Sequence, residues 1–414
     1  MAVSPSIEAA LADHAARHGL DAAVADLVRR AASEVPAFAR RLEDAGVDAR
    51  DVTSVAGLGA VPVLGKDEVL ELQQADPPFG GLLADGAQVV RVFQSPGPLY
   101  EPQLAGDGGD YWRWGQVLAD LGVGPGDTVL NCFGHHLSPA GAMMEAGALA
   151  VGARVLPGGI GSQDLQVQAI ADLGVTAYAG MPSYLKTLVE RYAAAGLDPA
   201  RWRLRRAMVT AEPLPDSLRA VLLERVAQVR MAYGTGETGL LGYETADGPE
   251  AGMMLADGVL VQVCDLGTGQ PVTDEREGQV VVTVLRPDYP LVRFGTGDLS
   301  GWMIGPDGLP RLRGVLGRTG AAVKVKGMFL HPRQVAAVMA DVPGVADSRF
   351  VIGRDDHLDT LRCEVVPGAG ADTDRLVGEV RDLVRDGLRF RAEVVVVEAL
   401  TPGDGPLVDT RDWS

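Results

Sequence analysis

The sequence predicts an α/β protein of two domains: a large amino-terminal domain, 1–316, with a mostly parallel sheet and a β-rich subdomain, and a small α+β domain, 317–414. Three observations support this prediction. Helical and strand patterns alternate over 111–212, hairpin-like strands follow residue 250, and a compact β/α pattern closes the chain. Apolar strands that alternate with helices across short glycine-containing turns are typical of right-handed crossovers in a parallel sheet.

Hydrophobic spacing justifies each element in turn. Residues 1–45 have helical spacing, and a loop-rich stretch with many prolines follows. The alternating part predicts helices at 111–122, 140–152, 164–174 and 182–196, and strands at 128–133, 153–159, 175–180 and 206–212. Hairpin strands are predicted at 259–272, 278–285 and 291–302. The small domain predicts strands at 322–330, 347–353, 361–366 and 392–400, and helices at 332–342 and 373–388.

Composition excludes several classes of protein. Among 414 residues, 37 Lys and Arg stand against 55 Asp and Glu, which gives a formal charge of −18. Nucleic acids and anionic membranes attract clustered positive charge, so we expect neither as a partner. The chain has no apolar run that could span a bilayer, no secretory signal pattern, and no metal-ligand spacing among its three cysteines. We therefore expect a cytoplasmic protein.

Three glycine-containing strings carry candidate chemistry. In YGTGETG at 233–239, glycines let backbone approach a ligand, and Glu237 could hold Mg²⁺ beside phosphate. In RFGTGD at 293–298, Asp298 could accept two hydrogen bonds from a ribose diol. GRTG at 317–320 precedes a basic strand. The alternative interpretations are a glycine turn with a solvated glutamate, an aspartate that caps a turn, and a basic surface strand beside a linker.

In order and spacing, these strings resemble the adenylate-forming enzyme superfamily and, within it, the phenylacetate–coenzyme A ligase family. Other segments also look like that family's motifs. They are VPVLGKDEVLELQQADPPFGGLLA at 61–84, MPSY at 181–184, AEP at 211–213 and HP at 331–332. The resemblance begins near residue 50 and covers most of the chain.

The resemblance implies a reaction in two steps. A carboxylic acid attacks the α-phosphate of ATP, which gives an acyl-adenylate and pyrophosphate, and a thiol then displaces AMP to give a thioester. ATP, AMP, Mg²⁺ and coenzyme A are the implied cofactors, and the small domain would be a lid that rotates between the steps. A small carboxylic acid or acyl thioester, preferably aromatic, and a homodimer are implied as well.

Carried over residue by residue, the resemblance assigns Glu237 to Mg²⁺ and, with Thr235, to catalysis. It assigns the nucleotide to Glu212, Pro213, Tyr233, Gly234, Asp298 and Arg318. It lines an acyl pocket with Cys132, Phe133, Tyr184 and Gly236, and it brings His135 or His136 to the substrate carboxylate as a catalytic group. Beside the two histidines, Cys132 could instead be an activated thiol or a buried strand residue.

The sequence departs from the family where the outer phosphates of ATP would bind. The family's phosphate loop, Ser-Ser-Gly-Thr-Thr-Gly-x-Pro, reads SPGPLYEP at 95–102. Ser95 and Gly97 remain, but two hydroxyl groups and one backbone N–H are lost, and Glu101 adds a negative charge. No lysine follows Lys326, so the lysine that the family carries near its carboxyl terminus is missing.

Three hypotheses therefore remain open at the level of sequence. The protein is an ATP-using acyl or aryl thioester ligase with an unusual phosphate loop. Alternatively, it transfers an acyl group between coenzyme A and the thiol of an acyl-carrier protein without ATP. In the third hypothesis it is a binding protein without catalytic activity. Pyrophosphate release would support the first, and exchange between thiols would support the second.

Overall fold

The computed structural model describes residues 5–95, 99–106, 108–319, 323–326, 328–330, 332–340, 342–368, 370–401 and 405–411. The chain divides into two compact units, Met1–Thr319 and Gly320–Ser414, which we call unit 1 and unit 2. This division lies three residues beyond the boundary that the sequence predicts. Within the described residues, no helix combines the length and the apolar character needed to cross a bilayer.

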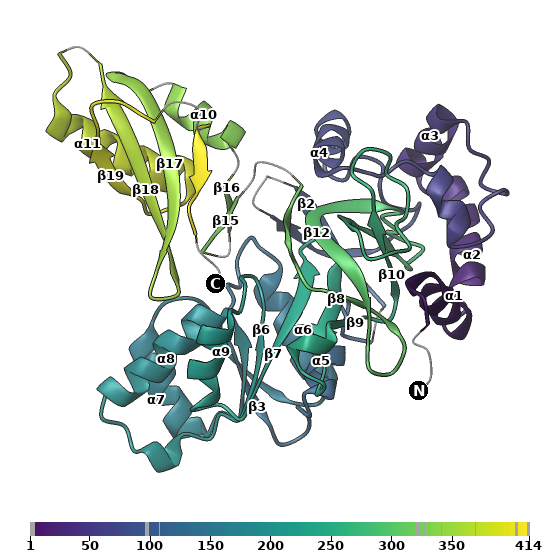
Figure 1. Ribbon diagram of the computed structural model, residues 1–414, viewed down its shortest axis with the longest axis horizontal. Helices are drawn as coiled ribbons and strands as arrows, with labels where there is room; N and C mark the ends of the chain where they lie inside the picture. The colour runs from purple at the N-terminus through teal and green to yellow at the C-terminus, as the bar shows by residue number, and fades with distance from the viewer. Residues whose placement is uncertain are drawn as a thin grey trace. The chain divides into compact units, whose positions relative to one another are not determined.

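The alternating part of unit 1 forms a parallel sheet, as the sequence predicts. Its strands lie in the order β4, β3, β5, β6 and β7. They are β3 (Thr128–Asn131), β4 (Arg154–Pro157), β5 (Ala177–Gly180), β6 (Arg206–Val209) and β7 (Gln228–Thr235). The helices between them are α6 (Ala140–Ala150), α7 (Gln163–Leu173), α8 (Pro182–Ala194) and α9 (Asp216–Leu223), and α5 (Gly115–Asp120) precedes them. Figure 1 shows α7, α8 and α9 on one side of these strands and α5 and α6 on the other.

Both faces of the central strand β5 are buried, which explains why its sequence is continuously apolar. On β5, Ala177 and Ala179 belong to one core together with Met143 of α6. Tyr178, between them, belongs to a second core together with Leu185 of α8. Successive strand residues point to opposite faces, so one short apolar run serves two cores.

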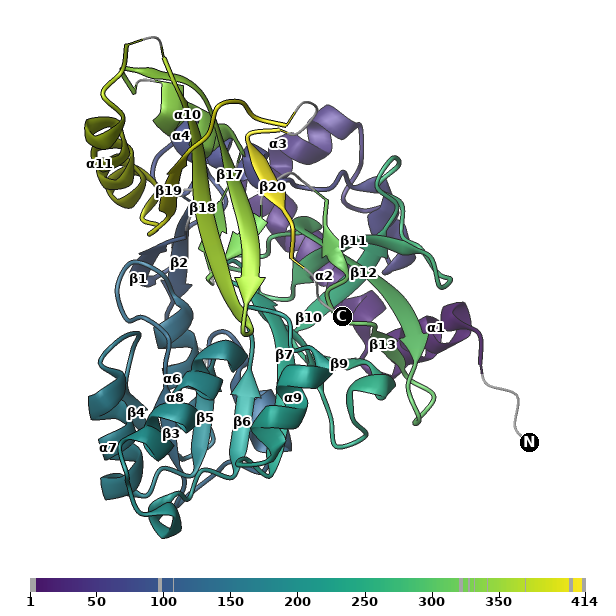
Figure 2. The same cartoon turned by 60° about the vertical axis from the view of Figure 1, so that its left-hand side comes forward.

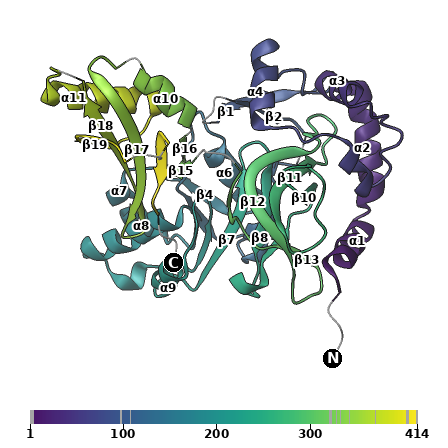
Figure 3. The same ribbon diagram turned by 45° about the horizontal axis from the view of Figure 1, so that its top comes forward.

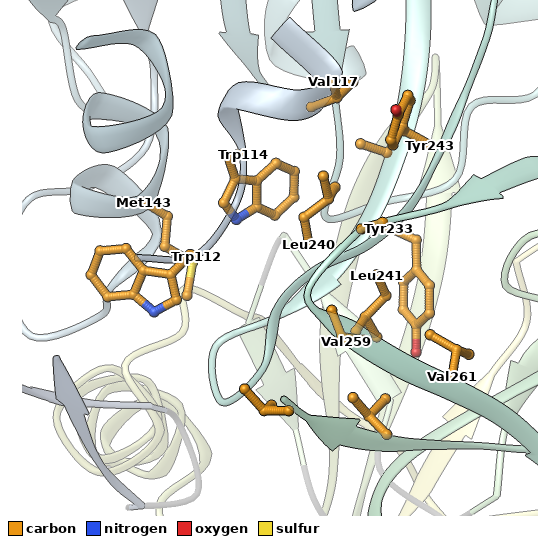
Figure 4. Packing of buried hydrophobic residues seen from close by; sticks show 14 of the residues in the cluster. Trp112, Trp114, Val117, Met143, Tyr233, Leu240, Leu241, Tyr243, Val259 and Val261 are labelled. Carbon is orange, nitrogen blue, oxygen red and sulfur yellow. The ribbon is translucent and has the colours of Figure 1, made fainter. Parts of the chain in front are cut away.

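β7 is the strand at which the sheet changes from parallel to antiparallel. It pairs parallel with β6 and antiparallel with β8. The antiparallel part contains β8 (Gly239–Glu244), β9 (Met253–Leu255), β10 (Val259–Cys264), β11 (Glu277–Val284), β12 (Phe294–Ile304), β13 (Pro310–Leu312) and β14 (Gly317–Arg318). In Figure 4, Tyr233 of β7 packs beside Val259 and Val261 of β10. This packing fixes the strand that carries the first glycine-containing string.

Three helices at the amino terminus confirm the predicted helical segment. They are α1 (Ile7–Arg17), α2 (Leu20–Glu34) and α3 (Pro36–Ala45). Figure 3 shows them along the antiparallel part of the sheet. Val24 and Phe38 share a buried core with Leu260 of β10, so these helices cover the β-rich region of unit 1.

The structure differs from the sequence prediction in the proline-rich stretch. Residues 50–110 contain α4 (Lys66–Ala75) and a hairpin of β1 (Val89–Gln94) and β2 (Tyr100–Leu104), in addition to a short 3-10 turn at Ala56–Ala60. Figure 2 shows the two hairpin strands side by side. The prolines lie outside α4 and β1. They make the stretch look like a loop in the sequence, but they do not interrupt either element.

The helix predicted at 111–122 is shorter than expected, because α5 begins only at Gly115. Arg113 has a left-handed backbone, with φ of 68°, which is incompatible with a continuous helix. Tyr111, Trp112 and Trp114 are instead buried in the core of unit 1. Burial of these aromatic rings outweighs local helix propensity here.

Unit 2 is an α+β unit with its own core, as predicted. Its four-stranded sheet has the order β19, β18, β17 and β20. The elements are β15 (Val323–Val325), β16 (Met328–Leu330), α10 (Pro332–Ala340), β17 (Val345–Asp355), β18 (Leu358–Pro367), α11 (Thr373–Leu383), β19 (Glu393–Val396) and β20 (Leu407–Asp409). Phe350, Cys363 and Val380 are fully buried in this core.

Candidate functional site

The turn between β7 and β8 presents the first candidate carboxylate. The Thr235 hydroxyl accepts a hydrogen bond from the Thr238 N–H at 3.2 Å and lies 2.9 Å from the Thr238 hydroxyl. Gly234 has no room for a side chain, because a Cβ there would lie 2.5 Å from the Gly239 carbonyl oxygen and 2.8 Å from Trp114. The tight turn therefore directs Glu237 inward, where its side chain is 7% exposed.

Lys66 neutralises Glu237. Its Nζ lies 2.6 Å from Glu237 Oε1, and its side chain is 29% exposed. Burial by itself would raise the pKa of Glu237, but the Lys66 ammonium, a backbone N–H and the Thr235 hydroxyl together outweigh burial, and the pKa lies below its ordinary value. Glu237 is therefore a carboxylate at neutral pH, which is the form that binds a hard cation.

Two separate contacts hold Lys66 in place at the start of α4. On one side, Leu64 forms a parallel bridge to Phe294 at the start of β12, and the Leu64 N–H donates to the Arg293 carbonyl at 2.8 Å. On the other side, the Gln73 amide donates to the Tyr100 carbonyl at 2.7 Å and accepts from the Tyr100 N–H at 2.8 Å. Figure 3 shows α4 beside β2. The helix thus links the hairpin to the large sheet.

Glu101 of β2 is a second buried acid at this place, and it is 4% exposed. Burial and the charge of Glu237 raise its pKa to about 8, while a hydrogen bond with the Ser95 hydroxyl and the charge of the Lys66 ammonium act in the opposite direction. Glu101 is therefore mostly protonated at neutral pH.

Asp298 of β12 is the other candidate carboxylate, and it is held by two groups. Its Oδ1 lies 2.8 Å from Arg318 Nη2, and its Oδ2 accepts a hydrogen bond from the Tyr233 hydroxyl at 2.9 Å. The same hydroxyl lies 3.2 Å from the Thr296 hydroxyl. Burial and the charge of Asp298 raise the pKa of Tyr233 well above its ordinary value, so the phenol remains a donor. The antiparallel pairing of Asp298 with Arg318 fixes this arrangement.

The donor set fits a nucleotide with its metal ion. Each oxygen of a carboxylate has two lone pairs, so Asp298 can still accept hydrogen bonds from a diol while it is held. Mg²⁺ typically takes one or two carboxylates and completes its shell with water and substrate phosphates. Glu237 can supply one of them, and no cluster of three or more acidic, His or Cys side chains occurs within the described residues to form a metal site of protein groups alone.

The residues at and after the end of β3, which the sequence assigns to an acyl pocket and a catalytic group, differ in their exposure to solvent. His135 and His136 are exposed, and His135 Nε2 lies 3.1 Å from Glu145 Oε2 of α6. Phe133 is buried in the core of unit 1. Cys132 is 1% exposed, and burial raises its thiol pKa, which argues against the activated thiol and favours the buried strand residue.

Three other predicted residues have local partners. Glu212 Oε1 accepts a hydrogen bond from the Ser183 N–H at 2.6 Å, so this carboxylate caps the amino terminus of α8. Pro213, which follows it, is exposed. The Tyr184 hydroxyl accepts from the Gly161 N–H at 3.1 Å and lies 2.7 Å from an amide oxygen of α7, which ties the loop before α7 to α8.

Of the segment predicted to be the phosphate loop, Ser95 follows β1, and residues 100–102 belong to β2. The Ser95 N–H donates to the Leu99 carbonyl at 3.0 Å, which closes the turn. Gly97 lies outside the described residues. In the last segment of unit 2, Arg411 is 3.2 Å from Asp359 and 2.7 Å from Asp409, and its side chain is 7% exposed. This arginine is engaged within unit 2 and does not replace the missing lysine.

Comparisons with known proteins agree with the fold. Residues 112–284 match the family model of the AMP-binding enzymes. The phenylacetate-coenzyme A ligase of Thermus thermophilus is 28% identical over 82% of this chain and 78% of its own length. That of Escherichia coli is 26% identical over 89% of this chain and 86% of its own length.

Solved structures of two related enzymes have a similar fold. A 2-hydroxyisobutyryl-CoA ligase in complex with 2-HIB-AMP and CoA, in its thioesterification state, is 25% identical, with a TM-score of 0.85, over 96% of this chain and 91% of its own. The amide bond synthetase McbA of Marinactinospora thermotolerans, 20% identical with a TM-score of 0.56 over 76% of this chain and 66% of its own, shares the fold. These likenesses confirm the adenylate-forming fold that the sequence predicts.

Proposed function

Because the chain belongs to the adenylate-forming enzymes as a divergent member of the phenylacetate–coenzyme A ligase family, we propose that it joins a small carboxylic acid to a thiol at the expense of ATP. In the first step, the substrate carboxylate attacks the α-phosphorus of ATP, and the bond to pyrophosphate breaks. In the second step, the thiol attacks the acyl carbon, AMP leaves, and the thiol proton is released to solvent. The thiol belongs to coenzyme A or to an acyl-carrier protein.

The observation that carries this proposal is that β7 connects two buried carboxylates: Tyr233 of β7 donates to Asp298, and Glu237 lies in the turn that follows β7. Asp298 and Tyr233 would bind the ribose hydroxyls, because both are held rigidly and buried. Glu237 would hold Mg²⁺, and Lys66 would then be released toward the phosphates. When bound, the metal ion would offset the negative charge that develops on the phosphates.

A second candidate is acyl transfer between two thiols without ATP. The engagement of Arg411 within unit 2 and the buried acid Glu101 beside Glu237 both favour it. Preorganised charges of the kind that are missing here are often worth about 10²-fold or more in rate. Adenylation would therefore be slow, whereas transfer from a preformed thioester would need none of these groups.

One experiment separates the two candidates. Pyrophosphate release is measured with ATP, Mg²⁺ and a panel of aromatic and small aliphatic acids, and acyl exchange is measured between acyl-CoA and a second thiol without ATP. We expect acid-dependent pyrophosphate release, lowered about tenfold or more in Asp298→Asn, which keeps the shape of the side chain. The control is Asp44→Asn, because Asp44 is an exposed acid on α3. Exchange without any pyrophosphate release would overturn the ligase proposal.

A further inference from the structure

A short segment between β2 and α5, residues 111–114, lies against the turn that carries Glu237. Its three aromatic side chains are buried in the core of unit 1, and Figure 4 shows two of them, Trp112 and Trp114. The proposed reaction gives this segment no task, yet its backbone is unusual. Arg113 has a left-handed conformation, with φ of 68°. A residue other than glycine is strained in that region and stays there only where its contacts determine its conformation.

The contacts of the segment reach three consecutive residues of the β7–β8 turn. The guanidinium of Arg113 donates a hydrogen bond to the Thr238 carbonyl. A Cβ at Gly239 would lie 2.6 Å from the Trp112 carbonyl oxygen, so only glycine lets the two backbones approach so closely. The same carbonyl accepts a hydrogen bond from the Leu240 N–H at 3.0 Å. The left-handed residue is therefore held where its side chain and its neighbour both contact the turn.

Other elements hold the segment at both of its ends. Arg286, which follows β11, donates to the Tyr111 carbonyl at 3.0 Å, and its Cζ lies 3.7 Å from the centre of the Tyr111 ring. The Tyr111 hydroxyl donates to the Pro102 carbonyl of β2 at 3.1 Å. At the other end, the Gly115 N–H donates to Asp110 Oδ2 at 2.7 Å. These contacts fix the segment independently of the turn that it touches.

Arg113 completes the restraint on the backbone of Thr238. The N–H of Thr238 donates to the Thr235 hydroxyl within the turn, and its carbonyl accepts from Arg113, which lies 125 residues earlier in the chain. Glu237 immediately precedes Thr238, so rotation of these peptide groups would also turn the Glu237 side chain. The direction of the carboxylate thus depends on one local contact and one distant contact.

We propose that Arg113 is a positioning residue for the metal ion: it holds the β7–β8 turn so that the Glu237 carboxylate is directed toward Mg²⁺. The inference rests on the proposed function, which places Mg²⁺ at Glu237. Groups that orient a metal ligand from outside the coordination shell commonly contribute about 10–100-fold to metal affinity. Asp298 is held by Arg318 and Tyr233 instead, so the binding of AMP without a metal ion does not depend on Arg113.

The test measures how much Mg²⁺ strengthens the binding of ATP. Calorimetric titrations of AMP, and of ATP with and without Mg²⁺, compare the wild type, Arg113→Gly and the control Arg154→Ala, since Arg154 is an exposed arginine on β4. Glycine adopts a left-handed backbone without strain, so Arg113→Gly removes the guanidinium and spares the backbone. We expect Mg²⁺ to strengthen ATP binding about tenfold less in Arg113→Gly than in the wild type, with AMP affinity unchanged. Arg154→Ala should follow the wild type.

A second measurement needs neither a nucleotide nor a metal ion. In the free protein, amide hydrogen exchange over residues 234–241 should be faster in Arg113→Gly than in the wild type, whereas exchange in β11 should be the same. If Arg113→Gly does not fold, Arg113→Lys takes its place, because it keeps the charge but lacks the planar guanidinium. It is expected to show both changes to a smaller extent.

The outcomes keep this inference apart from the proposed function. An unchanged effect of Mg²⁺ and unchanged exchange in the turn would overturn the role of Arg113 and leave the nucleotide site standing. Weaker binding of AMP as well, with faster exchange in β11, would show that Arg113 only stabilises unit 1, which also overturns the inference. Absence of binding of either nucleotide to the wild type would instead contradict the proposed function.

Discussion

Single side chains at the β7–β8 turn show how burial decides protonation. Glu237 and Glu101 are the same residue type in the same surroundings, yet their pKa values shift in opposite directions. The difference lies in the partners of Glu237: the Lys66 ammonium at 2.6 Å, a backbone N–H and the Thr235 hydroxyl all favour its ionised form. A buried carboxyl group ionises when charged or hydrogen-bonding partners replace its water, and at Glu101 these partners do not compensate for burial and the charge of Glu237.

This difference predicts a pH-dependent stability that can be assigned to Glu101. Its pKa is raised from an ordinary 4.5 to about 8 in the folded state, so between these values the unfolded chain loses a proton that the folded chain keeps. The contribution to folding stability is therefore present below the lower value and falls by up to about 1.4 kcal/mol per pH unit as pH rises toward the higher. Glu101→Gln removes this dependence.

The measurement is urea denaturation at a series of pH values, followed by fluorescence of the buried tryptophans of unit 1. The stability of Glu101→Gln relative to the wild type should increase as pH rises from about 5 to about 8. Glu71→Gln, an exposed acid, serves as the control. A constant difference between Glu101→Gln and the wild type across the range would show that Glu101 is ionised in the folded protein.

The short helix α4 positions two parts of the site. It carries Lys66 at its first residue and Gln73 on its buried side, and these two side chains contact β7–β8 and β2 respectively. A helix of 10 residues is too short to be stable alone, so these contacts and its apolar face determine where it lies. The hairpin is positioned in turn, because Gln73 binds both backbone groups of Tyr100.

We therefore predict that Gln73→Leu loosens the hairpin. The substitution removes two hydrogen bonds to the backbone of Tyr100, each worth about 0.5–1.5 kcal/mol. The expected result is lower stability of unit 1 and faster amide hydrogen exchange in β2 than in β11. Gln74→Leu, one residue further along and exposed, is the matched control. Equal exchange in both variants and the wild type would show that other contacts hold the hairpin.

The whole chain consists of two units, each with a separate core. Phe350, Cys363 and Val380 belong to a core whose members all lie in unit 2, whereas the other cores lie in unit 1. A unit that buries its own apolar side chains can fold without its neighbour. The Arg411 pair with Asp359 closes unit 2 by joining its last strand region to β18.

A fragment of residues 320–414 is expected to fold by itself. Circular dichroism should show a cooperative thermal transition, because the fragment retains its sheet, both helices and its core. Phe350→Ala in the fragment should lower its stability by about 3–5 kcal/mol and thereby abolish or sharply lower the transition. A fragment without cooperative unfolding would show that the core of unit 2 needs contacts from unit 1.

Much of the fold follows from local pattern. The alternation over 111–212 predicts the parallel strands, because short apolar runs between helices are typical of strands that are buried on both faces. Local sequence pattern does not predict the hairpin of β1 and β2. Its proline-rich sequence resembles a loop, and its pairing depends on contacts with Gln73, which lies far away in the sequence. Likewise, the helix predicted from residue 111 begins only at Gly115, because Tyr111 and Trp112 are buried in the core.

The amino-acid order alone determined the fold class, the place of the small unit, and the presence of carboxylates in glycine-containing strings, since these depend on neighbours along the chain. Only the tertiary structure decided the charge state of those carboxylates. Lys66, Glu101 and Glu237 are far apart in sequence, and their pKa values depend on distance and burial, which arise when α4, β2 and the β7–β8 turn pack together. Electrostatic energy depends on separation in space and on the exclusion of water, and neither quantity is contained in a pattern of neighbouring residues.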